Sequence, residues 1–222
     1  MSLFSRLSKM SRTRKLELFY DVMEPTAQTK ILDVGAEINP HGDRGLQLID
    51  GYRWRSNITA INSSGEQITL IRKHYPEIHA IVGDARSLPW PDKYFDVIYS
   101  NAVIEHVGSD EKQEKMASEI MRVGRRWFVS TPNRWYPFEF HIRLPLITWL
   151  PCHGYRSFGR IISYDHEKKR YMSGIKHDDL RLLTCTQLRQ LFPQSRIIKV
   201  RVTFMAESLI VVGGDVHIDQ IR

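Results

Sequence analysis

The sequence lacks the features that mark several broad classes of protein. Its 222 residues include only two cysteines, Cys152 and Cys185, too few for the disulfide framework of a small secreted domain. No segment approaches the roughly 20 uninterrupted apolar residues that a membrane-spanning helix needs. The first residues also lack the continuous apolar core and small-residue cleavage site of a secretory signal. We therefore expect a chain that works in the reducing cytoplasm and does not cross a bilayer.

Patterns typical of metal sites and of covalent catalysis are missing as well. Cys152 is followed by His153, and His177 is followed by two aspartates, but neither group has the paired ligand spacing of a zinc site. No serine lies in a nucleophile elbow. From the sequence we expect no bound metal.

What the chain does show is an alternation of apolar strands and amphipathic helices. Two helices are predicted from capping-box openings, Ser64 with Gln67 and Thr184 with Gln187, and a third from the charged stretch 109–123. Such alternation predicts an α/β fold with a parallel sheet covered on both faces, and 222 residues suit one domain, 1–222. The last two strands are joined by a short connection and should therefore be antiparallel. The predicted strands are 30–35, 57–62, 78–85, 95–107, 125–133, 196–202 and 207–214.

Polar residues gather where the first four predicted strands end. In an open parallel sheet, ligands bind beyond the carboxyl ends of the strands, at the place where the strand order reverses. One polar strand end would mean little, but four together favour a binding site. The residues in question are Asp33, Gly35, Asn62, Asp84, Ala85, Asn101, Glu105 and His106.

These segments resemble the class I S-adenosylmethionine-dependent methyltransferases of the small-molecule type, similar to methyltransferase type 11. The resemblance rests on "ILDVGAEINP", "ITAINSS", "RVGRRWFVSTPN" and, above all, "GDARSLPWPDKYFDVIYSNAVIEHV", and it covers residues 28–133. It implies a Rossmann-like, seven-stranded, mostly parallel sheet whose last strand is antiparallel. It also implies S-adenosylmethionine as the cofactor.

The resemblance implies a role for each residue at the strand ends. Gly35 would let the backbone approach the methionine part of the cofactor, and Asp33 would reach the cofactor's amino group. Asp84 would accept a hydrogen bond from the adenine amino group, beside the backbone amide of Ala85. Asn101 would lie where the fourth strand meets the cleft. The alternative for both aspartates is a local turn, in which the carboxylate bonds nearby backbone.

The sequence departs from the family pattern at two places. Ala36 and Glu37 occupy the turn where further glycines are usual, and glycine returns only at Gly42 and Gly45. A pyrophosphate needs those glycines, but this cofactor has no phosphate, so we interpret the stretch as a reshaped cofactor loop. The second departure is Asn62, where the family presents an acid to the ribose hydroxyls. Because an amide lacks the charge-assisted bonds of a carboxylate, we expect weaker cofactor binding, with Glu37 as a candidate substitute.

Methyl transfer to a hydroxyl requires aligned reactants, exclusion of water and removal of the acceptor proton. Two histidines are candidates for the base. His106 ends the fourth-strand motif, and His141 lies two residues from Glu139. The pKa of histidine, close to neutrality, suits either residue for this task. A surface or structural role is the alternative for each of them.

Two segments stand outside the alternating pattern. Residues 1–27 form a basic helical segment, which either packs its few apolar residues on the body or rests on anionic lipid or a phosphorylated substrate. Residues 134–183 are rich in aromatics and carry nine Lys or Arg against five acids. This stretch is too long for an ordinary connection and too aromatic for disorder, so we expect it to fold as a substrate lid.

The main hypothesis is a methyltransferase that uses S-adenosylmethionine to methylate an oxygen of a small-molecule, lipid-linked or glycan acceptor. The unusual first motif and Asn62 support a second hypothesis, a catalytically silent relative that acts as a binding or scaffold protein. A third hypothesis, nucleic-acid methylation, rests on the net charge of +7 alone. It ranks last because "STPNRW" is not the Asn-Pro-Pro-aromatic signature associated with methylation of base amino groups.

Overall fold

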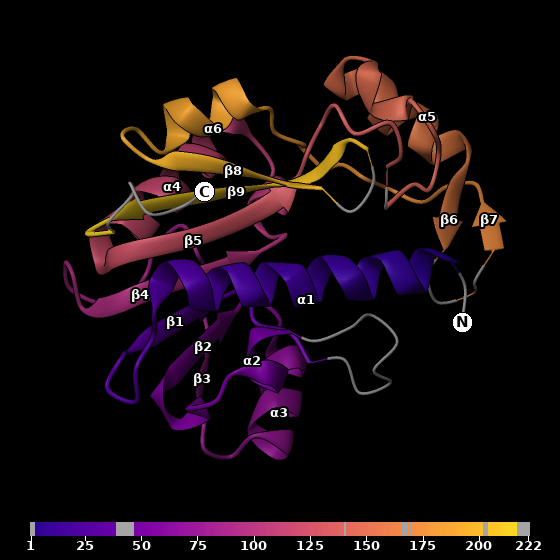
Figure 1. Cartoon of the computed structure of the whole chain (residues 1–222). Coiled ribbons are helices and arrows are strands. Elements are labelled where there is room, and N and C mark those ends of the chain that lie inside the picture. Colours follow the sequence, from indigo (N-terminus) through magenta and orange to yellow (C-terminus); the bar gives the residue numbers. More distant parts are fainter. Residues whose placement is uncertain are drawn as a thin grey trace.

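The computed structural model describes residues 3–38, 47–139, 141–165, 168, 170–201 and 204–216, with side chains from residue 9 onward. Seven strands form one sheet in the order β3-β2-β1-β4-β5-β9-β8 (Figure 1). Their bounds are β1 (Ile31–Val34), β2 (Ile58–Asn62), β3 (His79–Val82), β4 (Phe95–Asn101), β5 (Gly124–Pro132), β8 (Arg196–Arg201) and β9 (Ala206–Gly214).

The first five strands are parallel to their neighbours, and β9 runs antiparallel to both β5 and β8. This confirms the predicted Rossmann-like sheet of seven strands with an antiparallel last strand. One predicted boundary differs, because β4 ends at Asn101 rather than at residue 107. Ala102 has φ +58°, a left-handed conformation that a strand cannot continue through, and a short 3-10 helix, η2 (Ile104–His106), follows.

Helices cover both faces of the sheet, as predicted. Side chains of α1 (Leu3–Met23), α2 (Leu48–Gly51) and α3 (Gly65–His74) lie in one apolar cluster, and those of α4 (Asp110–Val123) and α6 (Cys185–Leu191) lie in another. The strands supply both clusters in alternation, since Ile31 belongs to the first cluster and Leu32 to the second. Because both faces are covered, the ends of the strands are where polar groups can gather.

The helices begin where their sequences predict. Ser64 and Ser109 accept hydrogen bonds from backbone N–H groups of α3 and α4, and Thr184 with Gln187 forms a complete capping box at α6. The apolar residues of α4, among them Met116 and Ile120, recur at helical spacing and are fully buried. The short helix α2, which follows the first motif, is not anticipated by the sequence pattern.

Residues 134–183 form an insertion between β5 and α6, drawn at the upper right of Figure 1. It contains η3 (Ile147–Trp149), α5 (Cys152–Ile161), β6 (Ser163–Asp165) and β7 (Arg170–Met172). Its own small apolar cluster includes Ile142, Tyr155 and Leu182. The insertion is tied to the body at its end, where the N–H of Arg181 donates to the Glu105 carbonyl at 2.7 Å. Its predicted action as a lid stays a prediction.

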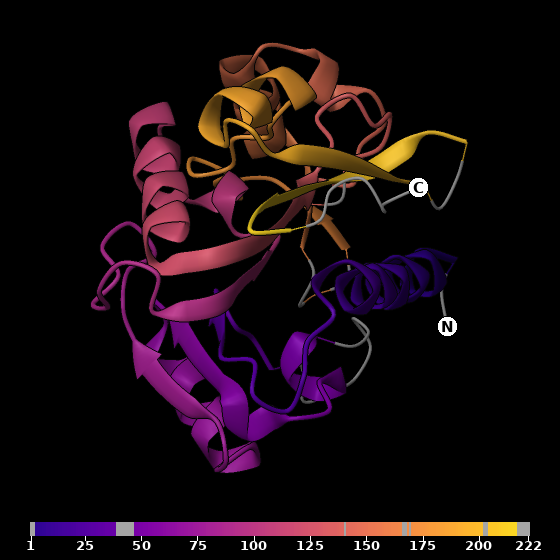
Figure 2. The ribbon, with the colours of Figure 1, turned by 60° about the vertical axis from the view of Figure 1, so that its left-hand side comes forward.

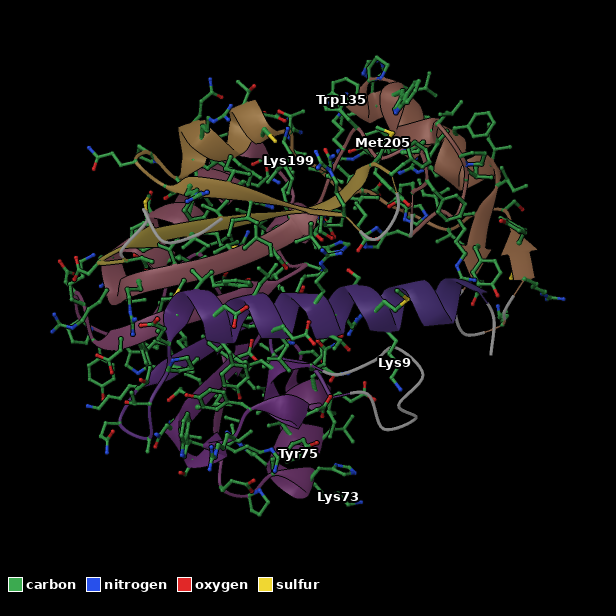
Figure 3. All side chains as sticks on the ribbon, viewed as in Figure 1. Lys9, Lys73, Tyr75, Trp135, Lys199 and Met205 are labelled. Carbon is green, nitrogen blue, oxygen red and sulfur yellow. The ribbon has the colours of Figure 1, made fainter. Side chains whose placement is uncertain are left out.

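The predicted basic segment at the N-terminus is the long helix α1. Phe19 is fully buried among the rings of Tyr52, Tyr99 and Phe128, so the C-terminal part of α1 packs on the sheet. Figure 2 shows that the N-terminal part of the helix extends beyond the sheet, and Lys9 projects from it in Figure 3. Among the described residues, none of the helices combines the length and the apolarity that crossing a membrane would require.

Candidate functional site

The parallel strands bring their polar ends to one edge of the sheet. β1 pairs with β2 on one side and with β4 on the other, so that Val34 is level with both Ile61 and Ser100. The strand order therefore reverses at β1, which lies centrally between neighbours that come later in the chain. Such a reversal opens a crevice at the carboxyl ends of the strands, where ligands bind in open α/β sheets.

Asp33, near the end of β1, is a buried carboxylate that faces other acids. It is 4% exposed, and within the described part of the chain its carboxylate has no hydrogen-bond partner. Burial, followed by the negative charges of Glu37 and Asp50, raises the pKa of Asp33 to about 8. A buried carboxyl group in this state would gain most from a cationic ligand. This fits the predicted contact with the amino group of the cofactor.

Gly35 makes the turn that follows β1. Its φ is +79°, which glycine adopts at little cost, and its N–H donates to the Ile61 carbonyl at 2.8 Å. A Cβ atom here would lie 2.3 Å from Cγ2 of Val103, so a neighbouring side chain of this chain itself requires the glycine. This close contact is with Val103, and it joins the β1 turn to the segment after β4. The predicted approach of the cofactor to Gly35 stays a prediction.

Asn62 ties the ends of β1 and β2 together. Its Nδ2 donates to the Ala36 carbonyl at 2.8 Å, and its Oδ1 accepts from the N–H of Ser64 at 2.8 Å. A carboxylate could not donate the first of these bonds, so the asparagine has a structural reason at this position. Ala36 is buried and Glu37 is exposed at the rim of the site. Gly42 and Gly45 lie outside the described residues.

Asp84 follows β3 and is held by the neighbouring Arg86. Nε and Nη2 of Arg86 lie 2.8 Å and 2.6 Å from the two carboxylate oxygens, and the backbone N–H of Arg86 also donates at 2.9 Å. These bonds lower the pKa of Asp84, so the group is an exposed, ionised acceptor. Ala85 packs at the margin of the apolar cluster around Leu88. The predicted bond from Asp84 to an adenine amino group would share this carboxylate with Arg86.

Asn101, at the end of β4, contacts the N-terminal helix. Its Oδ1 accepts from Oγ of Ser130 at 2.6 Å and from Nζ of Lys15 at 3.1 Å. Lys15 is buried, and burial together with the charge of Arg12 lowers its pKa to about 8. Helix α1 thus places a buried amine beside the predicted cleft. The sequence treats Lys15 only as part of a basic segment.

Glu105, on η2 just beyond β4, is the second buried carboxylate at this edge. It is fully buried, and Oε2 accepts from Oγ1 of Thr131 at 2.9 Å. Oε1 is buried and has no hydrogen-bond partner. Burial raises the pKa of Glu105, while the positive charges of His141 and Lys15 act in the opposite direction. A buried carboxylate oxygen of this kind calls for a partner, and the described residues do not supply one.

His106 and His141 meet at the same place, although 35 positions separate them in the chain. Their Nε2 atoms are 3.0 Å apart, and Nδ1 of His141 lies 2.6 Å from Oε1 of the buried Glu139. Burial lowers the pKa of His141, but the charge of Glu139 and its hydrogen bond outweigh this and raise it. Burial and the charge of His141 lower the pKa of His106. The structure therefore brings the two predicted bases together, as one group with Glu105.

Comparison with known proteins agrees with this architecture. A family model described as "Methyltransferase domain" matches residues 42–126. A probable S-adenosylmethionine-dependent methyltransferase of Mycolicibacterium smegmatis is 34% identical over 64 residues, which are 29% of this chain and 25% of that protein. The match thus spans about a quarter of the length of this curated relative.

Solved structures share the fold along most of the chain. A protein of Pyrococcus horikoshii OT3 is 18% identical with a TM-score of 0.60, and the match covers 91% of this chain and 89% of that one. A methyltransferase of Methanosarcina mazei is 14% identical with a TM-score of 0.57, covering 88% and 95%. Residues 42–126 thus match a methyltransferase-domain model, and the chain has the fold of these solved structures. The curated relative is described as S-adenosylmethionine-dependent, which agrees with the predicted cofactor.

A third structure of this methyltransferase fold shows the product form of the cofactor in place. It is a 1,6-didemethyltoxoflavin-N1-methyltransferase of Burkholderia thailandensis with S-adenosylhomocysteine bound, 14% identical with a TM-score of 0.51. The match covers 92% of this chain and 77% of that one.

Proposed function

We propose that this methyltransferase transfers the methyl group of S-adenosylmethionine to an oxygen of a small-molecule, lipid-linked or glycan acceptor. The observation that carries the proposal is Asp33, a buried carboxylate that faces the acids Glu37 and Asp50 at the strand-order reversal of the sheet. A cationic ligand would offset the free-energy cost of burying this carboxylate. The cofactor has two positive groups, an amine and a sulfonium. The bound cofactor supplies an activated methyl group, and the chain must do the rest.

The residues at the strand ends fit the cofactor without a further glycine. Asp33 would bind the amino group, the Gly35 turn would admit the methionine part, and Asp84 with Ala85 would hold the adenine. Glu37, exposed at the rim, would accept from the ribose, because the amide of Asn62 is already occupied by backbone partners. Asn101 would border the reacting end of the site, where it fixes Lys15.

The acceptor would enter beside the insertion. A narrow hollow lies between the end of β5 and the insertion, and its lining combines apolar and polar side chains. Such a mixture suits a small or amphipathic acceptor better than a strand of nucleic acid. The lining residues are Pro132, Asn133, Tyr136, Phe138, Glu139, Thr148, Leu182 and Glu207.

An oxygen acceptor is favoured because proton-handling groups lie on this side. A hydroxyl must lose its proton during methyl transfer, and His106 and His141 form a cluster with Glu105 next to the end of β4. The predicted use of either histidine as the base is part of this proposal. Glu139, which bonds His141 and also lines the hollow, would fix the ring that faces the acceptor.

A lipid-linked acceptor would agree with the outer surface of the insertion. Trp149, Phe158 and Ile161 are 51%, 45% and 68% exposed, and Arg160 lies among them on α5. Figure 3 shows Trp135, also exposed, on the same part of the molecule. Apolar side chains mixed with cations suit an anionic membrane surface. Vesicles with and without anionic lipid would test this contact by co-sedimentation, and equal binding to both would contradict it.

Methyl transfer from labelled S-adenosylmethionine tests the proposed function. The full chain is incubated with extracts of small molecules, lipids or total nucleic acid, and the label is followed into the organic, aqueous and acid-precipitable fractions. We expect label in the organic or aqueous fraction, in a methyl ether or ester identified by mass spectrometry. Label confined to nuclease-sensitive material would instead support the nucleic-acid hypothesis. Cofactor binding without transfer to any extract, or no binding, would support the scaffold hypothesis.

A further inference from the structure

Three potential metal ligands come together at the junction of β4 and the insertion. One ligand atom each from Glu105, His106 and His141 lies within 4.8 Å of the other two. His106 and Glu105 are adjacent on η2, whereas His141 comes from the insertion. The ligand atoms around one zinc ion lie roughly 3.3 Å apart, given bonds of about 2.1 Å, so a small side-chain adjustment suffices to close the set.

The two imidazoles hydrogen bond to each other and are also close enough to share one cation. Their Nε2 atoms face each other at 3.0 Å, a separation at which both could bind one ion at about 2.1 Å. The opposite ring nitrogen of His141 bonds the buried carboxylate of Glu139 at 2.6 Å. A carboxylate that fixes the far side of a histidine ring is the usual outer support of a metal-bound histidine.

Glu105 supplies an independent observation that favours a cation beside its carboxylate. Glu105 is fully buried, and its Oε2 accepts a hydrogen bond from Oγ1 of Thr131. Among the described residues, its Oε1 has no hydrogen-bond partner. A buried carboxylate oxygen left unpaired is costly, and an ion beside it would remove that cost. The neighbouring imidazoles of His106 and His141 offer two nitrogens that would complete such a set.

We infer that Glu105, His106 and His141 form a binding site for a divalent transition-metal ion, with zinc as the best match. Two imidazoles and one carboxylate are the ligand set of many catalytic zinc sites, and they leave a fourth position open. Imidazole nitrogens disfavour Mg²⁺ and Ca²⁺, which prefer oxygen. The open position would face outward, because His106 is exposed.

The role of the ion deepens the proposed function and rests on it. Two neutral imidazoles and one carboxylate leave a zinc site with a net positive charge, which favours an anionic oxygen in the open position. The acceptor hydroxyl would lose its proton to solvent water there. Its oxygen then forms the bond to the methyl group while the bond from that carbon to the sulfonium sulfur breaks, which leaves S-adenosylhomocysteine. In this form the ion replaces the histidine base of the proposed function. His106 and His141 bind the ion and do not take the proton themselves.

Zinc binding by the full chain tests the inference directly. Protein stripped with a chelator is titrated with Zn²⁺ by calorimetry, and Co²⁺ absorption serves as a second readout of ligand geometry. We expect one ion per chain, and His106→Gln and His141→Gln should each weaken binding roughly 100-fold or more. His153→Gln removes an exposed histidine of α5 outside the cluster and should bind like the wild type.

The outcomes separate this site from the proposed function, because S-adenosylmethionine binding is measured on the same samples. Absence of zinc binding in the wild type, or equal binding by all four proteins, overturns the metal site. Methyl transfer at full rate by the stripped protein also overturns the metal's role, while the proposed function stands with a histidine base. Zinc binding that needs both histidines, in a protein without affinity for S-adenosylmethionine, supports the metal site and defeats the proposed function.

Discussion

Two buried carboxylates lie near the carboxyl ends of neighbouring strands, and their surroundings differ. Asp33 faces the acids Glu37 and Asp50, whereas Glu105 faces His141 and Lys15. Burial raises the pKa of both groups, and among the described residues Oε1 of Glu105 has no hydrogen-bond partner. Under the two proposals above, these surroundings would suit different cations. The surroundings of Asp33, here called the Asp33 half, would suit a ligand that carries its own positive groups. The surroundings of Glu105, here called the Glu105 half, include two imidazoles whose nitrogens could bind an ion.

The sharpest way to test the Glu105 half is Glu105→Gln. The amide can still accept from Thr131, and it removes the buried charge, so the metal-free variant should be as stable as the wild type or more stable. Zinc affinity should fall roughly 100-fold or more, because an anionic ligand is lost. Thermal unfolding and zinc titration check both results. A less stable variant that retains full zinc affinity would contradict the account.

The junction between the halves is tested by Gly35→Ala. The new Cβ would meet Val103, and the φ of +79° is unfavourable for alanine, so the free energy of unfolding should fall by roughly 2–4 kcal/mol. In the double variant that also carries Val103→Ala, the free energy lost through the collision should be recovered. The free energy lost through the unfavourable φ should not. Urea unfolding of the single and double variants measures this. An equal loss with either residue at 103 would show that packing against Val103 contributes nothing.

The Asp33 half is tested by Asp33→Asn. The amide keeps the shape of the side chain but loses the charge that would bind the cofactor's amine, so affinity for S-adenosylmethionine should fall roughly 10- to 100-fold. Zinc affinity should not change, because Asp33 is outside the metal cluster. Calorimetry with each ligand separates these effects. Parallel losses in both affinities would mean that the variant disturbs the fold and that the halves are not distinct.

The raised pKa of Asp33 should also make the stability of the protein depend on pH. The folded pKa of Asp33, about 8, lies above its unfolded value near 3.9, so the folded state favours the protonated form. Its contribution to stability is complete below the unfolded pKa and is lost as the pH rises toward 8. Urea unfolding between pH 5 and 8 should therefore show a decline that Asp33→Asn reduces. Identical pH profiles for the two proteins would rule out an uncharged buried Asp33.

The sequence predicts where the residues around Asp33 lie in the fold, for a physical reason. Residues such as Gly35, Asp84 and Asn101 lie directly at strand ends, and hydrophobic periodicity alone locates those ends. The parallel arrangement then brings them to one edge without further information. Most strand boundaries follow from the same local patterns, although β4 ends at Asn101 and not at residue 107, and the antiparallel last strand follows from its short connection.

The Glu105 half could not be predicted in the same way, because it depends on long-range packing. His141 and Glu139 belong to the insertion, and no local pattern places them beside His106. The expectation that the chain holds no metal rested on spacing in sequence, which cannot detect ligands that meet only in the fold. Likewise, the contact of Lys15 with Asn101 depends on how α1 crosses the sheet. The donor role of Asn62 becomes clear only with the Ala36 carbonyl beside it.

The most direct test of the central claim is calorimetric titration of the full chain with S-adenosylmethionine at pH 7 in two buffers of different ionisation enthalpy. With a pKa of about 8, Asp33 is mostly protonated in the free protein, and it must ionise to bind the cofactor's cation. The account predicts one cofactor per chain and release of close to one proton, which Asp33→Asn abolishes. No binding, or binding with the same proton release in wild type and variant, would contradict it.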